Sequence, residues 1–309
     1  MPTAALAGDV GAEAVDAVRA GGWRVRGRLA GSPFGAAPGP REDVLGYLDV
    51  EELLDDARVD AVLLDGSDPD LAALLPALRD TGLLVLLPTP HPLDVEALRA
   101  ARSVDGPPSG VGLVRRWEPW ARTVRAALPL AGGPPLQVTV RGWPRGRAEA
   151  AELVDLAGRW CGEVAAVVAA PGPVPAPVLP GGEGVAWSLL TASGATVLVS
   201  HEGDGPSVRL SFAAARLMAA PDAVRWDGGA LLPLLGLPEA VPPAPRGVAA
   251  GLVATAASLA AAIGGGEPRH LGGPGEAATP ADLGDLLVAA RVLEALRTSA
   301  RTEQLVPVA

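Results

Sequence analysis

The chain has 309 residues, a formal charge of −10 and no lysine, so arginine supplies all 25 basic side chains. The absence of lysine excludes a Schiff base, a lysine general acid and a P-loop lysine. The negative charge argues against binding to nucleic acid or to anionic membranes. The single cysteine, Cys161, excludes an internal disulfide. Together with the lack of a signal-peptide pattern, it leads us to expect a cytoplasmic protein.

Apolar runs of strand length alternate with helical patterns over the first part of the chain. The expected strands cover residues 3–7, 23–30, 60–64 and a run that starts at 85, and the expected helices cover 12–20, 49–57, 70–79 and 94–101. Strands and helices that alternate at this spacing predict an α/β domain with a doubly wound parallel sheet.

The pattern changes after residue 136. Short strands separated by turns are expected at 136–141, 164–170, 185–190, 196–201 and 207–213, with helices at 148–160 and 279–299. This predicts an α+β domain with a largely antiparallel sheet. We place the first domain at residues 1–118 and the second at 119–309. The uncharged span 247–266 is long enough to cross a bilayer, but it is mostly Ala and Gly, so a packed helix is expected and no membrane contact.

The strand that starts at Val85 ends in alternating prolines, which cannot donate ladder hydrogen bonds. Ligands of open α/β sheets bind beyond the carboxyl ends of the strands. Thr89 and His91, which follow this strand, are therefore candidates for lining a site.

Four segments together resemble the Gfo/Idh/MocA oxidoreductases, and they lie in that family's order over nearly the whole chain. They are residues 47–64, the run Val-Leu-Leu-Pro-Thr-Pro at 85–90, the run Gly-Leu-Val-Arg-Arg-Trp-Glu-Pro-Trp at 112–120, and Glu-Leu-Val-Asp-Leu-Ala at 152–157. The resemblance implies a Rossmann domain, a sheet-based domain for substrate and oligomerisation, NAD or NADP, and sugar-like substrates.

The cofactor positions depart from the family pattern. In the G-x-G-x-x-G frame the first glycine is Leu6, and only Gly8 and Gly11 remain. The ribose-binding acid is also missing, although Ser32 and Arg28 nearby could favour a 2′-phosphate and hence NADP. The alternative is that Arg28 is a solvated strand residue. Ser67 and Thr89 complete the candidate cofactor contacts that the resemblance implies. The alternative is that the turn survives as scaffold and the cofactor has been lost.

The family's catalytic lysine position is Thr89, which cannot supply a cationic proton donor. His91 remains as a candidate acid or base, or as an ordinary polar residue at a strand end. The family's histidine position is Glu152, and its aspartate is kept as Asp155. Residues at i and i+3 share a helical face, so we expect the two carboxylates to raise one pKa between them, as a general acid needs. The alternative is a solvated acidic face that includes Glu149.

Arg115 and Arg116 form a candidate fork for a carboxylate, phosphate or sugar hydroxyls, with Trp117 and Trp120 beside them as candidate stacking groups. A surface arginine pair and tryptophans that pack in the core are the alternatives. The histidines and Cys161 show no spacing typical of a metal site, so no metal is expected.

Two functions are compatible with these residues. The first is a pseudo-oxidoreductase that serves as a partner subunit, or as a non-redox catalyst on a small molecule through Asp155, Glu152 or His91. The second is an active NAD(P)-dependent oxidoreductase with a rewired proton relay. In either case we expect a homodimer or higher oligomer through the second domain's sheet, or an assembly with an intact paralogue.

Overall fold

The computed structural model describes residues 1–29, 45–90, 94–129, 131, 134–172, 184–200, 206–213, 216–220, 223–227, 248–263 and 281–309. The chain divides into two compact units. The first comprises Met1–Val114 and Gly247–Leu287, and the second comprises Arg115–Arg246 and Val288–Ala309.

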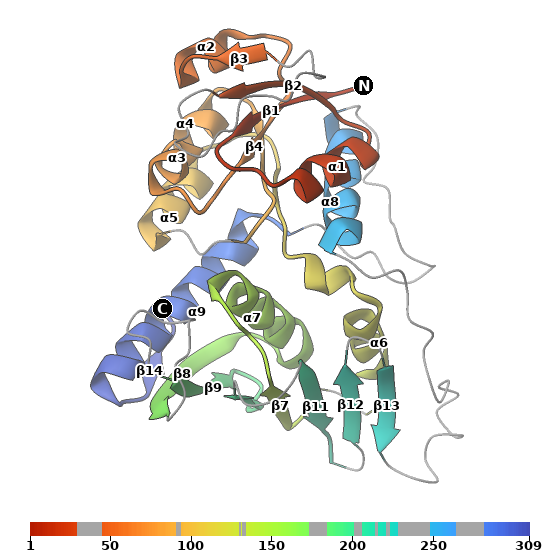
Figure 1. Cartoon of the computed structure of the whole chain (residues 1–309). Helices are drawn as coiled ribbons and strands as arrows, with labels where there is room; N and C mark the ends of the chain where they lie inside the picture. Colours follow the sequence, from red (N-terminus) through yellow and green to blue (C-terminus); the bar gives the residue numbers. More distant parts are fainter. Residues whose placement is uncertain are drawn as a thin grey trace. The chain divides into compact units, whose positions relative to one another are not determined.

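The first unit contains a parallel sheet with the strand order β3-β2-β1-β4-β5-β6 (Figure 1). Its strands are β1 (Thr3–Ala7), β2 (Arg24–Leu29), β3 (Leu45–Tyr47), β4 (Ala61–Leu64), β5 (Leu84–Leu87) and β6 (Ser109–Val111). All described pairings in this sheet are parallel. Every residue of β4 and β5 is buried, because helices cover both faces of such a sheet. The expected doubly wound fold is confirmed.

The helices of this unit are α1 (Ala12–Ala20), α2 (Val50–Asp55), α3 (Pro69–Ala73), α4 (Leu75–Asp80), α5 (Val95–Ser103) and α8 (Val248–Ile263). Side chains cap three of them: Asp49 accepts from the backbone of α2, Asp68 from that of α3, and Asp94 from that of α5. The single helix expected at 70–79 is wrong, since α3 and α4 are separate. Pro76 lies in the first turn of α4, where its missing N–H is tolerated, but it cannot continue the hydrogen bonds of a preceding helix.

Helix α8 is the packed small-residue helix that its composition predicts, but it groups with the first unit, whereas the sequence analysis expects it in the second domain. The indole Nε1 of Trp23 donates to the carbonyl oxygen of Ala256 at 2.7 Å. A Cβ on Gly21, at the end of α1, would lie 2.7 Å from the Cβ of Ala256. Leu252, Ala256 and Leu259 belong to the same buried core cluster as α1 and the first strands. Small residues on α8 therefore allow it to approach α1 closely.

The second unit contains a mixed sheet with the order β13-β12-β11-β7-β10-β9-β8-β14. Its strands are β7 (Gln137–Arg141), β8 (Val164–Gly172), β9 (Gly184–Thr191), β10 (Thr196–Ser200), β11 (Ser207–Ser211), β12 (Arg216–Ala220), β13 (Ala223–Asp227) and β14 (Val306–Pro307). The described pairs are antiparallel except for β7 with β10. The expected largely antiparallel sheet is confirmed, and β12, β13 and β14 extend it beyond the strands expected.

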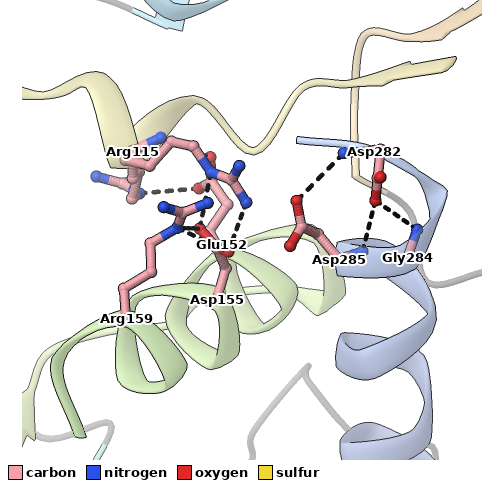
Figure 2. A network of polar contacts seen from close by, with 8 residues as sticks. Arg115, Glu152, Asp155, Arg159, Asp282, Gly284 and Asp285 are labelled. Atoms are coloured by element: carbon pink, nitrogen blue, oxygen red, sulfur yellow. Dashed lines mark hydrogen bonds and ion pairs between the residues drawn. The ribbon is translucent and has the colours of Figure 1, made fainter. Parts of the chain in front are cut away.

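Helical segments of the second unit are the 3₁₀ turn η1 (Val114–Trp117), α6 (Pro119–Ala127), α7 (Arg147–Cys161) and most of α9 (Leu283–Thr302). Figure 1 shows α6, α7 and α9 on one side of the sheet. The Oδ1 atom of Asp282 accepts from the N–H groups of Gly284 at 2.7 Å and Asp285 at 3.1 Å and so caps α9 (Figure 2). The expected start at residues 279 and 280 lies outside the described residues. None of the helices in the described ranges has the length and hydrophobicity needed to cross a membrane.

Candidate functional site

A pocket of about 170 Å³ lies within the first unit at the carboxyl ends of β1, β4 and β5. Its lining residues are Asp9, Val10, Gly11, Glu13, Ala14, Asp65, Pro88, Thr89 and Leu252. We call it the strand-end pocket. Asp9 follows β1, Asp65 follows β4 and Thr89 follows β5, so the parallel sheet brings these residues together although they are distant in sequence.

The turn between β1 and α1 keeps part of its expected geometry. Gly8 is buried and has a φ of 90°, a left-handed conformation that L-residues rarely adopt. Gly11 is the N-cap of α1 and lines the pocket. A Cβ added at Gly11 would meet no atom within 4 Å, so packing of the chain itself does not require glycine there.

The electrostatics of the strand-end pocket do not fit a dinucleotide diphosphate. Three carboxylates, Asp9, Glu13 and Asp65, line the pocket, and no arginine does so among the described residues. The N-terminus of α1 contributes only about half a positive charge against them. The described groups therefore repel a phosphate more than they attract it.

Of the other candidate cofactor residues, one lines the strand-end pocket and one does not. Thr89 is exposed and lines the pocket. Ser67 is not among the lining residues: its hydroxyl donates to Oδ2 of Asp65 at 2.8 Å and its N–H to Oδ1 at 2.9 Å. Ser67 thus orients a pocket carboxylate. Ser32 and His91 lie outside the described residues, as do the other two histidines.

A second set of candidates meets within the second unit, where η1 packs against α7. Arg116 binds Asp155 at two points, from Nη2 to Oδ1 at 2.6 Å and from Nε to Oδ2 at 3.1 Å. Nε of Arg159, one turn along α7, donates to Oδ1 of the same carboxylate at 3.2 Å. The side chains of Arg116 and Asp155 are 1% and 6% exposed. This is a buried, bidentate ion pair, the strongest arginine–carboxylate geometry.

Arg115 binds three further acids, of which Figure 2 shows Glu152. Its Nε donates to Oε2 of Glu152 at 2.9 Å, and its backbone N–H donates to Oε1 at 3.3 Å. Its other nitrogens lie 3.4 Å from Glu118 and 3.6 Å from Glu149. We call Arg115, Arg116, Glu118, Glu149, Glu152, Asp155 and Arg159 the ion-pair cluster. In it the candidate catalytic acids bind the candidate substrate-binding arginines.

Burial raises the pKa of Glu152 to about 7, even though Arg115 lowers that pKa and only the charge of Glu118 adds to the rise. The i, i+3 spacing of Glu152 and Asp155 predicts that the charge of Asp155 causes such a rise. Instead the loss of water around the carboxyl is the main cause, because the Glu152 side chain is only 8% exposed. Near neutral pH, Glu152 is therefore divided between its charged and neutral forms.

The tryptophans mostly support the ion-pair cluster. Trp120 is buried, its ring meets that of Trp160 edge to face at 5.8 Å, and its indole N–H donates to Glu118. The Arg115 guanidinium lies 4.9 Å from the centre of the Trp143 ring, at cation–π distance. Trp117 is half-buried in η1. No group of histidine, cysteine or acidic residues within the described ranges is arranged to hold a metal ion.

Sequence reasoning missed the pocket acids Asp9, Glu13 and Asp65. Two of them could have been found, because Asp65 directly follows a buried parallel strand and Asp9 stands two residues beyond one, as Thr89 does. It also missed the pairing of Arg115 and Arg116 with α7, because these contacts join residues 37 and 39 positions apart.

Comparisons with known proteins identify the fold. An oxidoreductase from Agrobacterium radiobacter, solved with NAD+, L-tartaric acid and magnesium, is 17% identical, with a TM-score of 0.71 over 99% of this chain and 98% of that one. Levoglucosan dehydrogenase with NADH and levoglucosan is 16% identical, with a TM-score of 0.68 over 99% of both chains. The aldose-aldose oxidoreductase from Caulobacter crescentus with glycerol is 18% identical, with a TM-score of 0.68 over 99% of both chains. No protein-family model and no curated protein sequence matches this chain.

At these identities the comparisons establish the fold alone. The chain has the two-part fold of these oxidoreductases, and the resemblance in its sequence is confirmed at the level of the fold.

Proposed function

We propose that this protein is a pseudo-oxidoreductase that keeps the fold of these dehydrogenases without transferring hydride and acts as a partner subunit in an assembly with an intact paralogue. The observation that carries the proposal is the ion-pair cluster. Asp155 and Glu152, at the positions where the resemblance implies proton transfer, are bound by Arg116 and Arg115, at the positions where it implies substrate binding. Groups that neutralise each other in this way are not available to a substrate.

The strand-end pocket supports the same proposal. A dinucleotide must place its diphosphate beside the turn after β1, where Asp9, Glu13 and Asp65 present negative charge. Because Asp9 and Glu13 are exposed, water screens them, and each unit charge about 8 Å from a phosphate opposes binding by about 0.5 to 1 kcal/mol. The pocket instead suits a small ligand that is neutral or positively charged.

The proposal also agrees with two properties of the whole chain. No lysine exists to replace the family's proton donor. Cys161 is free and buried, and burial raises the pKa of its thiol to about 12, which makes it inert in the reducing cytoplasm where we place the protein.

Calorimetric titration of the purified chain with NADH and with NADPH tests this function. We expect no saturable heat at concentrations up to about 1 mM, which corresponds to less than about 4 kcal/mol of binding free energy. Submillimolar binding, together with loss of the reduced-nicotinamide absorbance when a sugar-like substrate is added, would refute the proposal.

One observation favours the alternative of an active NAD(P)-dependent oxidoreductase. The carboxyl at the family's histidine position, Glu152, has its pKa raised to about 7, close to that of a histidine. A bound cofactor would supply the hydride, and Glu152 would hold and move the proton. In that case Glu152→Gln abolishes turnover without changing cofactor affinity, and the pH–rate profile of the native chain shows a group titrating near pH 7.

A further inference from the structure

Three apolar side chains form one part of the wall of the strand-end pocket. They are Val10, Pro88 and Leu252, which come from the turn before α1, the segment after β5 and helix α8. Val10 and Leu252 belong to the buried core cluster of the first unit. Helix α8 packs closely there, since a Cβ on Gly251 would lie 2.7 Å from the Cβ of Val114. This apolar wall is therefore preformed, and it favours a ligand with an apolar part.

Three carboxylates supply the acidic part of the lining, and they come from separate elements. Asp9 stands beyond β1, Glu13 in the first turn of α1, and Asp65 after β4. Strands β1 and β4 are neighbours at the point where the strand order reverses, which is where open α/β sheets bind ligands. The dipole of α1 accounts for an acid such as Glu13 in its first turn, but it does not account for Asp65. Neither Asp9 nor Glu13 forms an ion pair with a described residue, so negative charge converges on the pocket without a described cation to balance it.

Gly11 supplies independent evidence that the pocket accommodates a ligand. Its φ of −57° and ψ of 150° are accessible to any L-residue, so the backbone does not require glycine. A Cβ at this position would meet no atom within 4 Å, so the packing of the chain does not require glycine either. Ser or Asp would also cap α1 better. Glycine at this lining position is therefore explained by a ligand that needs the space of a side chain.

A metal ion does not account for the pocket carboxylates. Mg²⁺ and Ca²⁺ need about six or more oxygen ligands that converge on one point. Among the residues that the structure describes, no group of His, Cys, Asp and Glu is arranged in this way. An organic ammonium ion makes a smaller demand, because each N–H donates a single hydrogen bond and the positive charge acts over a longer distance. Its alkyl chain can pack on Val10 and Leu252, as the stem of a charged side chain packs on an apolar surface.

We propose that the strand-end pocket binds a small organic ammonium ion with a short alkyl chain, in the space where the fold implies a dinucleotide. The carboxylates of Asp9, Glu13 and Asp65 accept hydrogen bonds from the ammonium group, and the hydroxyl of Thr89 offers a further acceptor. The volume of about 170 Å³ is roughly ten times what one water needs, so a chain of about six non-hydrogen atoms fits. The inference goes beyond the partner-subunit role proposed above and does not depend on it.

Calorimetric titration of the full chain with putrescine, a short alkyl diamine, tests the proposal at low salt. We expect saturable binding with a dissociation constant below about 1 mM. Asp9→Asn with Asp65→Asn should weaken this binding about tenfold, because two ion pairs with the ligand are lost. Asp16→Asn, an exposed acid of α1 that does not line the pocket, is the matched control and should change the affinity less than about twofold.

A second variant tests the space in the pocket without changing its charge. Gly11→Val places a side chain at the lining and should weaken putrescine binding about tenfold, because the valine takes the place of the ligand. Gly146→Val is the matched control. Gly146 is also the N-cap of a helix, α7, and a Cβ there would likewise meet no atom within 4 Å, but it does not line the pocket. We expect the control to bind putrescine within about twofold of the native chain.

No saturable binding of putrescine by the native chain would overturn the proposal. Equal losses in the double variant and in Asp16→Asn would overturn it too, because net charge would then govern the binding. Tighter binding of butanol or of magnesium chloride than of putrescine would assign the pocket to a neutral ligand or to a metal instead. Should the double variant fail to fold, Asp9→Asn alone is expected to bind about threefold more weakly. The two proposals fail separately: NADH binding with putrescine binding intact refutes only the loss of the cofactor, and no binding of either ligand refutes only this inference.

Discussion

The strand-end pocket of the first unit and the ion-pair cluster of the second both hold carboxylates, but the surroundings of these charges differ between the two regions. In the cluster, Asp155 and Glu152 are buried and bound to arginines. In the pocket, Asp9 and Glu13 are exposed and form no ion pair with a described residue. The acids of the ion-pair cluster therefore contribute to the structure. Those of the strand-end pocket shape the electric field of a cavity and decide which ligands enter it.

Breaking the buried ion pair of Arg116 with Asp155 tests whether the ion-pair cluster stabilises the structure. It has the largest expected effect on the free energy of unfolding. Arg116→Ala leaves the Asp155 carboxylate buried, with Arg159 as its remaining ion-pair partner among the described residues. We expect a loss of about 3 to 5 kcal/mol in the free energy of unfolding, measured by urea denaturation. Arg99→Ala, which removes an exposed pair with Glu96, is the control and should cost less than about 1 kcal/mol. A loss below about 1 kcal/mol for Arg116→Ala would mean that the cluster does not stabilise the fold.

The pH dependence of stability tests the state of Glu152. Its pKa is about 7 in the folded chain against a model value of 4.5, so the folded chain holds this proton more tightly than the unfolded chain. The contribution of Glu152 to the free energy of unfolding is therefore largest below pH 4.5 and falls by about 3 kcal/mol as the pH rises to about 7.

Denaturation at a series of pH values in Glu152→Gln measures this contribution. We expect the variant to lose the decline between about pH 4.5 and 7. Glu149→Gln, on the same helix, provides the control and should keep the native profile. If Glu152→Gln also shows the native pH profile of stability, then Glu152 is fully ionised in its pair with Arg115.

Substitution of two glycines, one beside the strand-end pocket and one in α7 of the ion-pair cluster, compares how tightly the backbone is packed in the two regions. A Cβ at Gly112 would lie 1.9 Å from the carbonyl oxygen of Pro88, which lines the strand-end pocket, so the backbone must shift. We expect Gly112→Ala to destabilise the chain by about 2 kcal/mol in thermal unfolding. A Cβ at Gly158, inside α7, would meet nothing within 4 Å, so Gly158→Ala should stabilise by about 0.5 to 1 kcal/mol. The opposite sign at either position would contradict the packing described for it.

Removing acidic charges from the strand-end pocket tests whether its electric field opposes anions. The expected effect, on the affinity for pyrophosphate, is the smallest of the series. Asp9→Asn with Asp65→Asn should strengthen the binding of pyrophosphate by at least about tenfold in calorimetry, because two repulsive charges are removed. The control is Asp16→Asn, an exposed acid of α1 that does not line the pocket. Equal gains in the variant and the control would show that net charge, rather than the pocket, governs anion binding.

The sequence predicts most of the fold, because hydrophobic periodicity and capping residues are local signals. The buried run of β5, the cap at Asp94 and the small-residue composition of α8 could all be recognised without contacts. Two features depend on which elements meet and could not be recognised: the parallel pairing of β7 with β10, and the grouping of α8 with the first unit. The candidate acids and arginines were identified as important, but their charges were expected to face a ligand, and only the tertiary structure pairs them with each other.

The hydrogen bond from Trp23 to Ala256 joins residues 233 positions apart, and this separation has a consequence for synthesis of the chain. While the ribosome makes the protein, the first sheet emerges early, but α8 follows only after most of the second unit. The surface of α1 that α8 covers is therefore exposed to the cell during most of translation. The core of the second unit is also completed late, because α9 and β14 are synthesised last. Neither unit can complete its core as a nascent fragment, so folding is delayed until nearly the whole chain has emerged.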